Sequence, residues 1–469
     1  MARPLPLLCA LVLLLALLLA GCLGAGEAAV PPAANASPNG TPVPNATHGA
    51  TMTNTTATLV FRDPDLSFEL VRTLGKALGH GADVGESLET ARRIAAHEPE
   101  GLRPVLDAWY REWNATAERI HAIGVGCEAK NHTVSAGEAY LRASEYYRAA
   151  DFFLHDNPAN PEIGRLWDAM HTDFVRGLQL TGVRFEEVEI PYGNTTLYGY
   201  FFPAHADGRR APTIIVHQGF DGTAEECWFG VGADAVARGY NVLAFDGPGQ
   251  GRAIRKQGLH FRPDWENVVT PVLNWTLLRR DVDPARVVLY GISMGGYLAP
   301  RAAAYEPRLR AVIANEGVYD VFENDAFAAR MTPDQLRDFI ENEPDMYNQA
   351  VAGMIRNSTQ LYWATTHGEW AFGVATPAEL MKAHEAYTVN GSADRIRCPV
   401  LVLDVESEQF FADQSRQLYD ALPPGLGTMI TFGASEGAGL HCQAGAQLLG
   451  NQRIFDWLDE ELARTGKDR

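Results

Sequence analysis

The sequence feature that most constrains the fold is a glycine-rich turn between a short apolar run and a helical segment. The run Arg286 to Tyr290 has the residues of a buried strand and leads into Gly-Ile-Ser-Met-Gly-Gly at 291–296. A strand that turns this sharply into a helix needs small residues on both sides of the turn, and Gly291 and Gly295 supply them. We therefore expect Ser293 to sit in a strained conformation that projects its hydroxyl above a sheet.

Further apolar runs alternate with helix-length segments and predict an α/β fold, with a mostly parallel sheet and helices on both faces. A hairpin begins this region, and the last expected strand precedes a long C-terminal helix. The expected strands are Arg184 to Pro191, Thr195 to Pro203, Thr213 to His217, Asn241 to Phe245, Arg286 to Tyr290, Ala311 to Ala314 and Val400 to Leu403.

The chain divides by composition and periodicity into four parts. Residues 1–21 form an apolar leader and residues 22–60 a stalk rich in Pro, Thr and Asn, which cannot build a core. Helical spacing of apolar residues predicts a helical domain over 61–182. The sheet domain then covers 183–465, with a helical cap insertion at about 319–393 that is rich in aromatic residues.

The leader indicates export. Arg3 precedes an apolar run that ends in Leu-Ala-Gly-Cys at 19–22, which is typical of a lipoprotein signal peptide. We expect Cys22 to carry a lipid that anchors the protein to the outer face of the cell membrane. An uncleaved membrane helix is the alternative, although the run is short for a span.

Ten Asn-x-Ser/Thr sequons make surface glycosylation a hypothesis for an exported chain. They begin at Asn35, Asn39, Asn45, Asn54, Asn114, Asn131, Asn194, Asn274, Asn357 and Asn390.

The formal net charge of −19 argues against a nucleic-acid partner, because phosphate binding needs basic patches. The cysteines that remain after the leader and Cys22 fit neither a disulfide framework nor a metal site, so we expect buried free thiols. They are Cys127, Cys227, Cys398 and Cys442.

A serine needs a base, and the best-placed histidine is His441, in a small-residue loop after the last strand. The acid that orients this histidine is expected just beyond strand Val400 to Leu403, where Asp404, Glu406 and Glu408 compete. In the family that these motifs resemble, the acid lies about nine residues after the proline that opens this strand, which favours Glu408. Asp404 is the rival, because aspartate is the commoner residue type here.

Attack on a carbonyl group creates an oxyanion that two backbone N–H groups must stabilise. One is expected from Met294, which follows the nucleophile. The other is expected from the loop after strand Thr213 to His217, where Phe220 is our first choice and Gly219 the second.

These motifs resemble the α/β-hydrolase superfamily. More narrowly, the helical N-terminal region and Gly-Ala-Gly-Leu-His-Cys at 437–442 resemble the FrsA-like branch, over roughly residues 61–465. That branch includes 2,6-dihydroxypseudooxynicotine hydrolases and fungal polyketide-shortening hydrolases of the yellowish-green type. The resemblance implies a helical cap over a hydrolase core and metal-free, cofactor-free cleavage of esters or of carbon–carbon bonds next to carbonyl groups.

We therefore expect a serine hydrolase that acts on a small-molecule acyl substrate, an ester being the safest class. Hydrolysis of a carbon–carbon bond and peptidase activity of the prolyl oligopeptidase type are the alternatives. A different class is a catalytically inactive fold used as a cell-surface binding module. The sequence leaves the oligomeric state open, including a homodimer.

Overall fold

The computed structural model describes residues 59–324 and 331–464. The predicted signal peptide, Cys22 and nearly all of the stalk lie outside the described residues. In the described ranges, no helix combines the length and the apolar character needed to cross a membrane.

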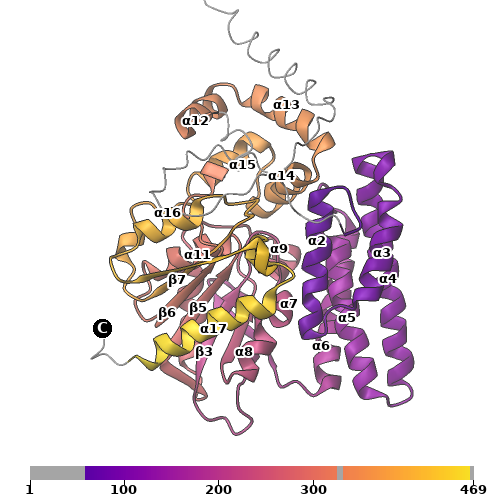
Figure 1. Ribbon diagram of the computed structural model, residues 1–469, viewed down its shortest axis with the longest axis vertical. Helices are drawn as coiled ribbons and strands as arrows, with labels where there is room; N and C mark the ends of the chain where they lie inside the picture. The colour runs from indigo at the N-terminus through magenta and orange to yellow at the C-terminus, as the bar shows by residue number, and fades with distance from the viewer. Residues whose placement is uncertain (1–58, 325–330, 465–469) are drawn as a thin grey trace, which may run out of the picture. The chain divides into compact units, whose positions relative to one another are not determined.

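The first part of the described chain is helical, as expected, and its long helices stand side by side (Figure 1). Asp63 caps the first helix by accepting hydrogen bonds from two backbone N–H groups, and a left-handed glycine, Gly182, ends the last one. Trp109, Trp113 and Tyr146 are fully buried between them. The helices are α2 (Pro64–Gly75), α3 (Val84–Ala95), α4 (Leu102–Glu128), α5 (Thr133–Asp151) and α6 (Pro161–Thr181).

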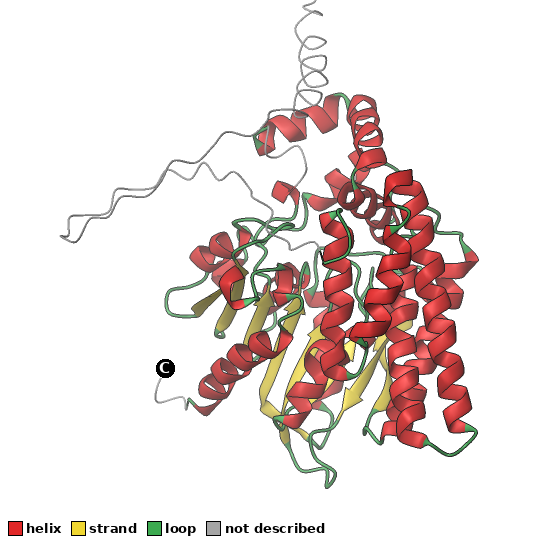
Figure 2. Cartoon of the chain, turned by 45° about the vertical axis from the view of Figure 1, so that its right-hand side comes forward, coloured by secondary structure: helices red, strands yellow, loops and turns green. Residues whose placement is uncertain are grey.

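Eight strands in the described residues form one sheet, which Figure 2 shows behind the helices. Their order is β1-β2-β4-β3-β5-β6-β7-β8. The first two pair antiparallel with their neighbours, and all pairings from β4 onward are parallel. The strands are β1 (Glu186–Tyr192), β2 (Thr195–Phe202), β3 (Ala211–His217), β4 (Asn241–Phe245), β5 (Val282–Ile292), β6 (Ala311–Asn315), β7 (Val400–Val405) and β8 (Gly427–Phe432).

The sequence predicted seven of these strands to within a few residues and missed β8. That strand lies at the end of the sheet, and only Phe432 among its six residues is buried. It therefore lacks the continuous apolar run by which a buried parallel strand is recognised.

Helices cover both faces of the sheet. Leu273 of α10 and Leu298 of α11 pack on one face, whereas Ile454 and Leu458 of α17 pack on the other. The short helices after β3 and β4 complete the layers. The helices of this part are α7 (Ala224–Cys227), α8 (Ala233–Ala237), α9 (Gly251–Gln257), α10 (Glu266–Leu277), α11 (Gly295–Ala303), α16 (Gln414–Ala421) and α17 (Gln447–Ala463).

The insertion between β6 and β7 forms a helical cap beyond the carboxyl ends of the strands (Figure 1). It also contacts the N-terminal helices: Thr359 Oγ1 donates to Asp63 Oδ2 at 2.5 Å, and Arg103 Nη1 donates to the Tyr362 hydroxyl at 3.0 Å. The cap therefore bridges the helical part and the sheet. Its helices are α12 (Pro333–Asn342), α13 (Pro344–Met354), α14 (Thr359–Phe372) and α15 (Pro377–His384).

The four cysteines in the described residues are free thiols, as expected. Cys227 and Cys398 are buried, but Cys127 and Cys442 are partly exposed. The expectation of burial was therefore wrong for two of the four.

Candidate active site

The turn from β5 into α11 has the strain that its sequence predicts. Ser293 has a φ of 60°, in the left-handed region that residues other than glycine rarely adopt. A Cβ at Gly291 would lie 2.0 Å from the Gly295 carbonyl oxygen, so only glycine fits there. At Gly295 the nearest atom would be 3.2 Å away, which is a milder constraint. Gly296 is the stricter position, because its Cβ would lie 1.4 Å from the Glu316 carbonyl oxygen.

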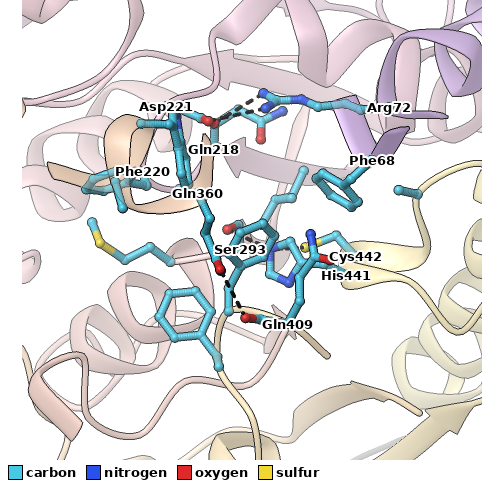
Figure 3. Close-up of a pocket in the computed structure, with 18 of the residues that line it drawn as sticks. Phe68, Arg72, Gln218, Phe220, Asp221, Ser293, Gln360, Gln409, His441 and Cys442 are labelled. Carbon is cyan, nitrogen blue, oxygen red and sulfur yellow. Dashed lines mark hydrogen bonds and ion pairs between the residues drawn. The ribbon is translucent and has the colours of Figure 1, made fainter. Parts of the chain in front are cut away.

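The structure brings Ser293, His441 and Glu408 together in one hydrogen-bonded chain. His441 Nε2 lies 2.8 Å from Ser293 Oγ, and His441 Nδ1 lies 2.8 Å from Glu408 Oε2. Figure 3 shows the serine and the histidine facing each other in the cavity. The imidazole and the carboxylate are both buried, and Phe410 packs edge-on against the imidazole ring with the centroids 4.8 Å apart.

The other two carboxylates of the acid loop are bound elsewhere. Asp404 Oδ2 accepts from Thr431 Oγ1 at 3.0 Å, and Glu406 Oε2 accepts from the Ala434 amide at 2.7 Å. Glu408 Oε1 accepts from the backbone amides of Phe410 and Phe411 at 2.7 and 3.0 Å. These two hydrogen bonds fix the carboxylate opposite the imidazole.

The interactions among these catalytic residues shift the pKa values of Glu408 and His441 in opposite directions. Burial opposes ionisation of Glu408, but His441 and the two backbone amides outweigh burial and lower the pKa of the carboxyl group. Burial likewise opposes protonation of His441. The Cys442 sulfur and the Glu408 carboxylate favour protonation and raise the pKa of the imidazole well above its usual value.

The loop after β3 lies against the serine turn. A Cβ on Gly219 would lie 2.6 Å from the Met294 nitrogen, so the chain segment of Gly219 and Phe220 approaches the turn closely. Gln250 holds this loop by donating from Nε2 to the Gly219 carbonyl at 2.9 Å. The sequence analysis assigned no role to Gln250.

A cavity of about 390 Å³ opens over Ser293. The cap, the helix α2 and the loop before α16 all contribute to its walls, and Figure 3 shows Phe68 and Phe220 on two of them. The wall is largely apolar and aromatic. Its large apolar residues include Phe68, Phe220, Tyr347, Met354, Trp363, Leu380, Met381, Phe410 and Phe411.

One wall carries an ion network that the sequence did not reveal. Arg72 of α2 bonds to Asp221 at 3.2 Å and to Glu226 at 3.0 Å, both in the segment after β3. Lys76 lies 3.4 Å from the same Glu226. Burial raises the pKa of the neighbouring Glu69 to about 7. The network joins the helical part to the sheet domain beside the cavity.

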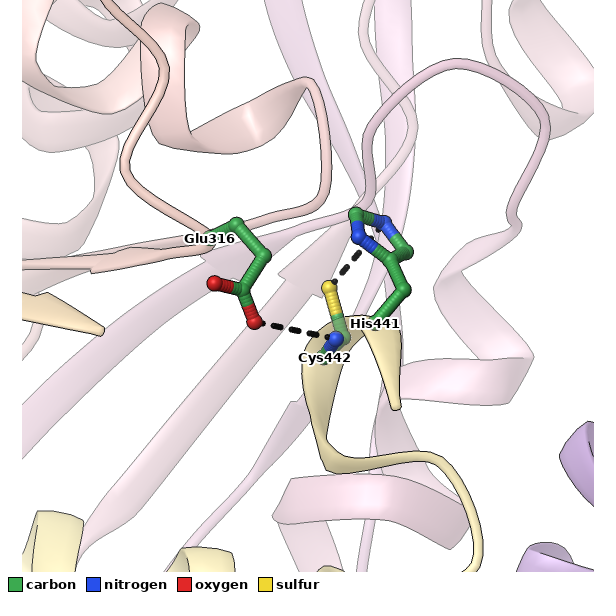
Figure 4. Close-up of side chains that lie close together, drawn as sticks. All are labelled: Glu316, His441 and Cys442. Carbon is green, nitrogen blue, oxygen red and sulfur yellow. Dashed lines mark hydrogen bonds between the residues drawn. The ribbon is translucent and has the colours of Figure 1, made fainter. Parts of the chain in front are cut away.

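Glu316 and Cys442 form a cluster with His441, the histidine that also contacts Ser293 and Glu408 (Figure 4). Their candidate ligand atoms lie within 4.8 Å of one another. Cys442 Sγ is 3.3 Å from His441 Nε2, and Glu316 Oε1 accepts from the Cys442 amide at 3.1 Å. A cation held by all three would compete for the nitrogen that contacts Ser293. Glu316 follows directly on β6, and that position at the end of a parallel strand was the signal that could have identified it.

A parallel sheet with a strained serine after β5, an acid after β7 and a histidine after the last strand has the layout of an α/β hydrolase. The alpha/beta hydrolase family matches residues 213–439. Hydrolase LUC6 of a Fusarium species is 34% identical over 86% of this chain and 97% of its own length. The chain therefore belongs to the α/β-hydrolase family, and the protein is a hydrolase.

Other relatives agree over nearly their whole length. Hydrolase acrC of Aspergillus aculeatus is 35% identical, over 84% of this chain and 96% of the relative. The 20-hydroxy-prefusarin hydrolase FUS2 of Gibberella moniliformis is 33% identical, over 86% of this chain and 98% of the relative.

Among solved structures, the 2,6-dihydroxy-pseudo-oxynicotine hydrolase superposes with a TM-score of 0.63 at 18% identity, over 83% of this chain and 96% of that one. At that identity the likeness concerns the fold. The expected similarity to these hydrolases and to fungal hydrolases of the superfamily is confirmed.

Proposed function

We propose that the protein is a serine hydrolase that cleaves a carboxylic ester or a related acyl bond through an acyl-enzyme. The observation that carries the proposal is the hydrogen-bonded chain from Ser293 through His441 to Glu408. A serine hydroxyl becomes nucleophilic when a base accepts its proton, and the carboxylate orients that base and stabilises its protonated form.

In the first step, His441 Nε2 takes the Ser293 proton while Oγ attacks the carbonyl carbon. The amides of Met294 and Phe220 stabilise the resulting oxyanion. Protonated His441 then gives its proton to the leaving oxygen, and the bond to the alcohol breaks. Water, activated by His441, attacks the acyl-enzyme and releases the acid and the free serine.

The cavity supports an apolar or aromatic acyl group. Its wall is made largely of aromatic, leucine and methionine side chains, which bind apolar surface without requiring polar partners. Cap and N-terminal helices both contribute, so they set the size of the substrate.

Hydrolysis of a carbon–carbon bond next to a carbonyl group is the second candidate. It is favoured by the relatives, which include proteins named as hydrolases of 20-hydroxy-prefusarin and of 2,6-dihydroxy-pseudo-oxynicotine rather than as esterases. The same serine and histidine would serve both reactions.

Labelling by a fluorophosphonate probe tests the proposal, because the probe reacts with an activated serine. The wild-type protein should be labelled and should hydrolyse short p-nitrophenyl esters. Ser293→Ala and His441→Ala should lose both properties while remaining folded. Labelling of Ser293→Ala, or an unlabelled wild type, would refute the assignment, and the second outcome would favour an inactive binding module.

We also propose that the enzyme is exported and lipid-anchored through Cys22, at the end of the stalk over residues 22–60. The sequons give this proposal some support, because five of the six beyond the stalk have exposed asparagines; Asn114 is partly buried. The exposed ones are Asn131, Asn194, Asn274, Asn357 and Asn390.

A further inference from the structure

Two buried histidines lie where the helical part, the cap and the sheet domain meet. His155 follows α5 and is 3% exposed, and His367 of α14 is 1% exposed. Their Nδ1 atoms are 2.8 Å apart. The other nitrogen of each ring is also bound: His155 Nε2 lies 3.1 Å from Asp151 Oδ2, and His367 Nε2 lies 2.8 Å from the Phe220 carbonyl oxygen.

These contacts form a row of hydrogen bonds from Asp151 through the two histidines to the Phe220 carbonyl. The groups at its two ends fix the number of protons that the histidines carry. Burial alone would raise the pKa of Asp151, but Arg255 and His155 outweigh burial and lower it, so the group is an acceptor. The Phe220 carbonyl is also an acceptor. Both outer nitrogens must therefore carry hydrogen, and the short contact between the two inner nitrogens needs one hydrogen more. Two neutral imidazoles hold two N–H protons, whereas this row requires three, so one ring is an imidazolium.

The charged side chains around the pair balance one another, so no unpaired carboxylate is left to stabilise a second positive charge. Asp151 and Asp221 are the facing acids, and Arg255 is the facing base. Arg255 bonds to Asp151, while Arg72 bonds to Asp221. Burial, followed by the charge on His155, lowers the pKa of His367 to about 3, which excludes a second charge at neutral pH.

We propose that His155 and His367 share one positive charge and act as positioning residues for the oxyanion loop. The pair ties cap helix α14 to the Phe220 carbonyl, and thereby holds the loop whose amide stabilises the oxyanion. The positioning role rests on the proposed function; the proton count does not.

Loss of the shared proton would weaken this tie. When alkaline pH removes the shared proton, only two N–H protons remain for three contacts. One contact then lacks a hydrogen, and two acceptors face each other there: between the rings, between His155 Nε2 and Asp151 Oδ2, or between His367 Nε2 and the Phe220 oxygen. In the molecules in which His367 Nε2 is the nitrogen without hydrogen, the cap and the loop separate at the Phe220 carbonyl, and kcat therefore falls at alkaline pH.

Nitrogen-15 NMR of histidine-labelled protein tests the proton count without using activity. The signals of the pair are assigned by their loss in His155→Gln and His367→Gln. At neutral pH, three of the four nitrogens should be protonated, with one proton lost at alkaline pH. Two neutral rings at neutral pH would overturn the proposal, whether or not Ser293 reacts with fluorophosphonate.

The pH dependence of kcat tests the positioning role. In His155→Gln the glutamine amide can still donate to Asp151, and neutral His367 can keep its proton on Nε2 for the Phe220 carbonyl. This variant should retain kcat within about twofold at neutral pH and lose the alkaline decline. His367→Phe removes the donor and should lower kcat by about tenfold at all pH values, with a smaller change in KM.

Two further variants make this test specific. His367→Gln restores a donor to the carbonyl and should recover most of the loss seen in His367→Phe. His260 contacts α14 outside the pair, through the Trp370 carbonyl at 3.0 Å, so His260→Gln should keep the wild-type profile. An alkaline decline that is the same in wild type and His155→Gln would refute the role of the pair.

Discussion

Replacing Glu408 by glutamine removes one charge from the catalytic chain at nearly constant volume. In the wild type, Glu408 Oε2 lies 2.8 Å from His441 Nδ1, while Oε1 accepts two backbone amides. If the side-chain oxygen of the glutamine still accepts hydrogen bonds from those two amides, the NH₂ group of the glutamine faces His441 Nδ1. Nδ1 must then accept a hydrogen bond, and the ring proton moves to Nε2, where it faces Ser293. The base is in the wrong tautomer, so kcat should fall by roughly three to four powers of ten, or about 4–5.5 kcal/mol of barrier.

The assay is the hydrolysis of a p-nitrophenyl ester, with kcat and KM measured separately. KM should change little, because the carboxylate does not line the cavity. Asp404→Asn is the matched control. Asp404 accepts a hydrogen bond from Thr431 and has no contact with His441, so this substitution should lower kcat far less. The reverse order of effects would make Asp404 the acid and refute the assignment of Glu408.

The remaining predictions concern other parts of the molecule. For pH, the pKa of His441 is raised, so kcat/KM should fall as pH drops through that pKa; a pH-independent rate would contradict this. In Gly219→Ala, the new Cβ would meet Met294 N at 2.6 Å, so kcat should fall at least tenfold in ester assays. Urea unfolding of Arg72→Leu should show that the free energy of unfolding falls by about 3–5 kcal/mol, because Asp221 loses its guanidinium partner and buried Glu226 loses one of its cationic partners. Cys22→Ser should release the protein from membranes or block its processing; unchanged fractionation would indicate an uncleaved helix.

Local pattern was enough to predict most of the sheet and the turn at Ser293, whereas the choice of Glu408 over Asp404 also needed the spacing of the family that the motifs resemble. A buried parallel strand is a short apolar run, and the turn at Ser293 requires glycine by sterics alone. Counting from Pro399 placed Glu408, and the structure puts that carboxylate beside His441. The catalytic roles themselves stay predictions until they are measured.

The sequence did not reveal contacts between residues far apart in the chain. Periodicity shows which face of a helix is buried, but not which distant side chain it will meet. Arg72 meets Asp221 and Glu226 across about 150 positions, and His155 meets His367 across 212. In the sequence, His155 and His367 therefore cannot be distinguished from ordinary loop and helix residues.

The wall that α2 contributes to the cavity bears on how such an enzyme can diversify. Phe68 and Arg72 lie far upstream of residues 213–439, the segment that carries the family signature. Selection can therefore alter the shape of the cavity by changing α2, without disturbing the serine turn or the sheet. For the same reason, a fragment trimmed to the signature segment would lack both His441 and this wall. Chimaeras that exchange α2 between relatives offer a direct route to altered substrate choice.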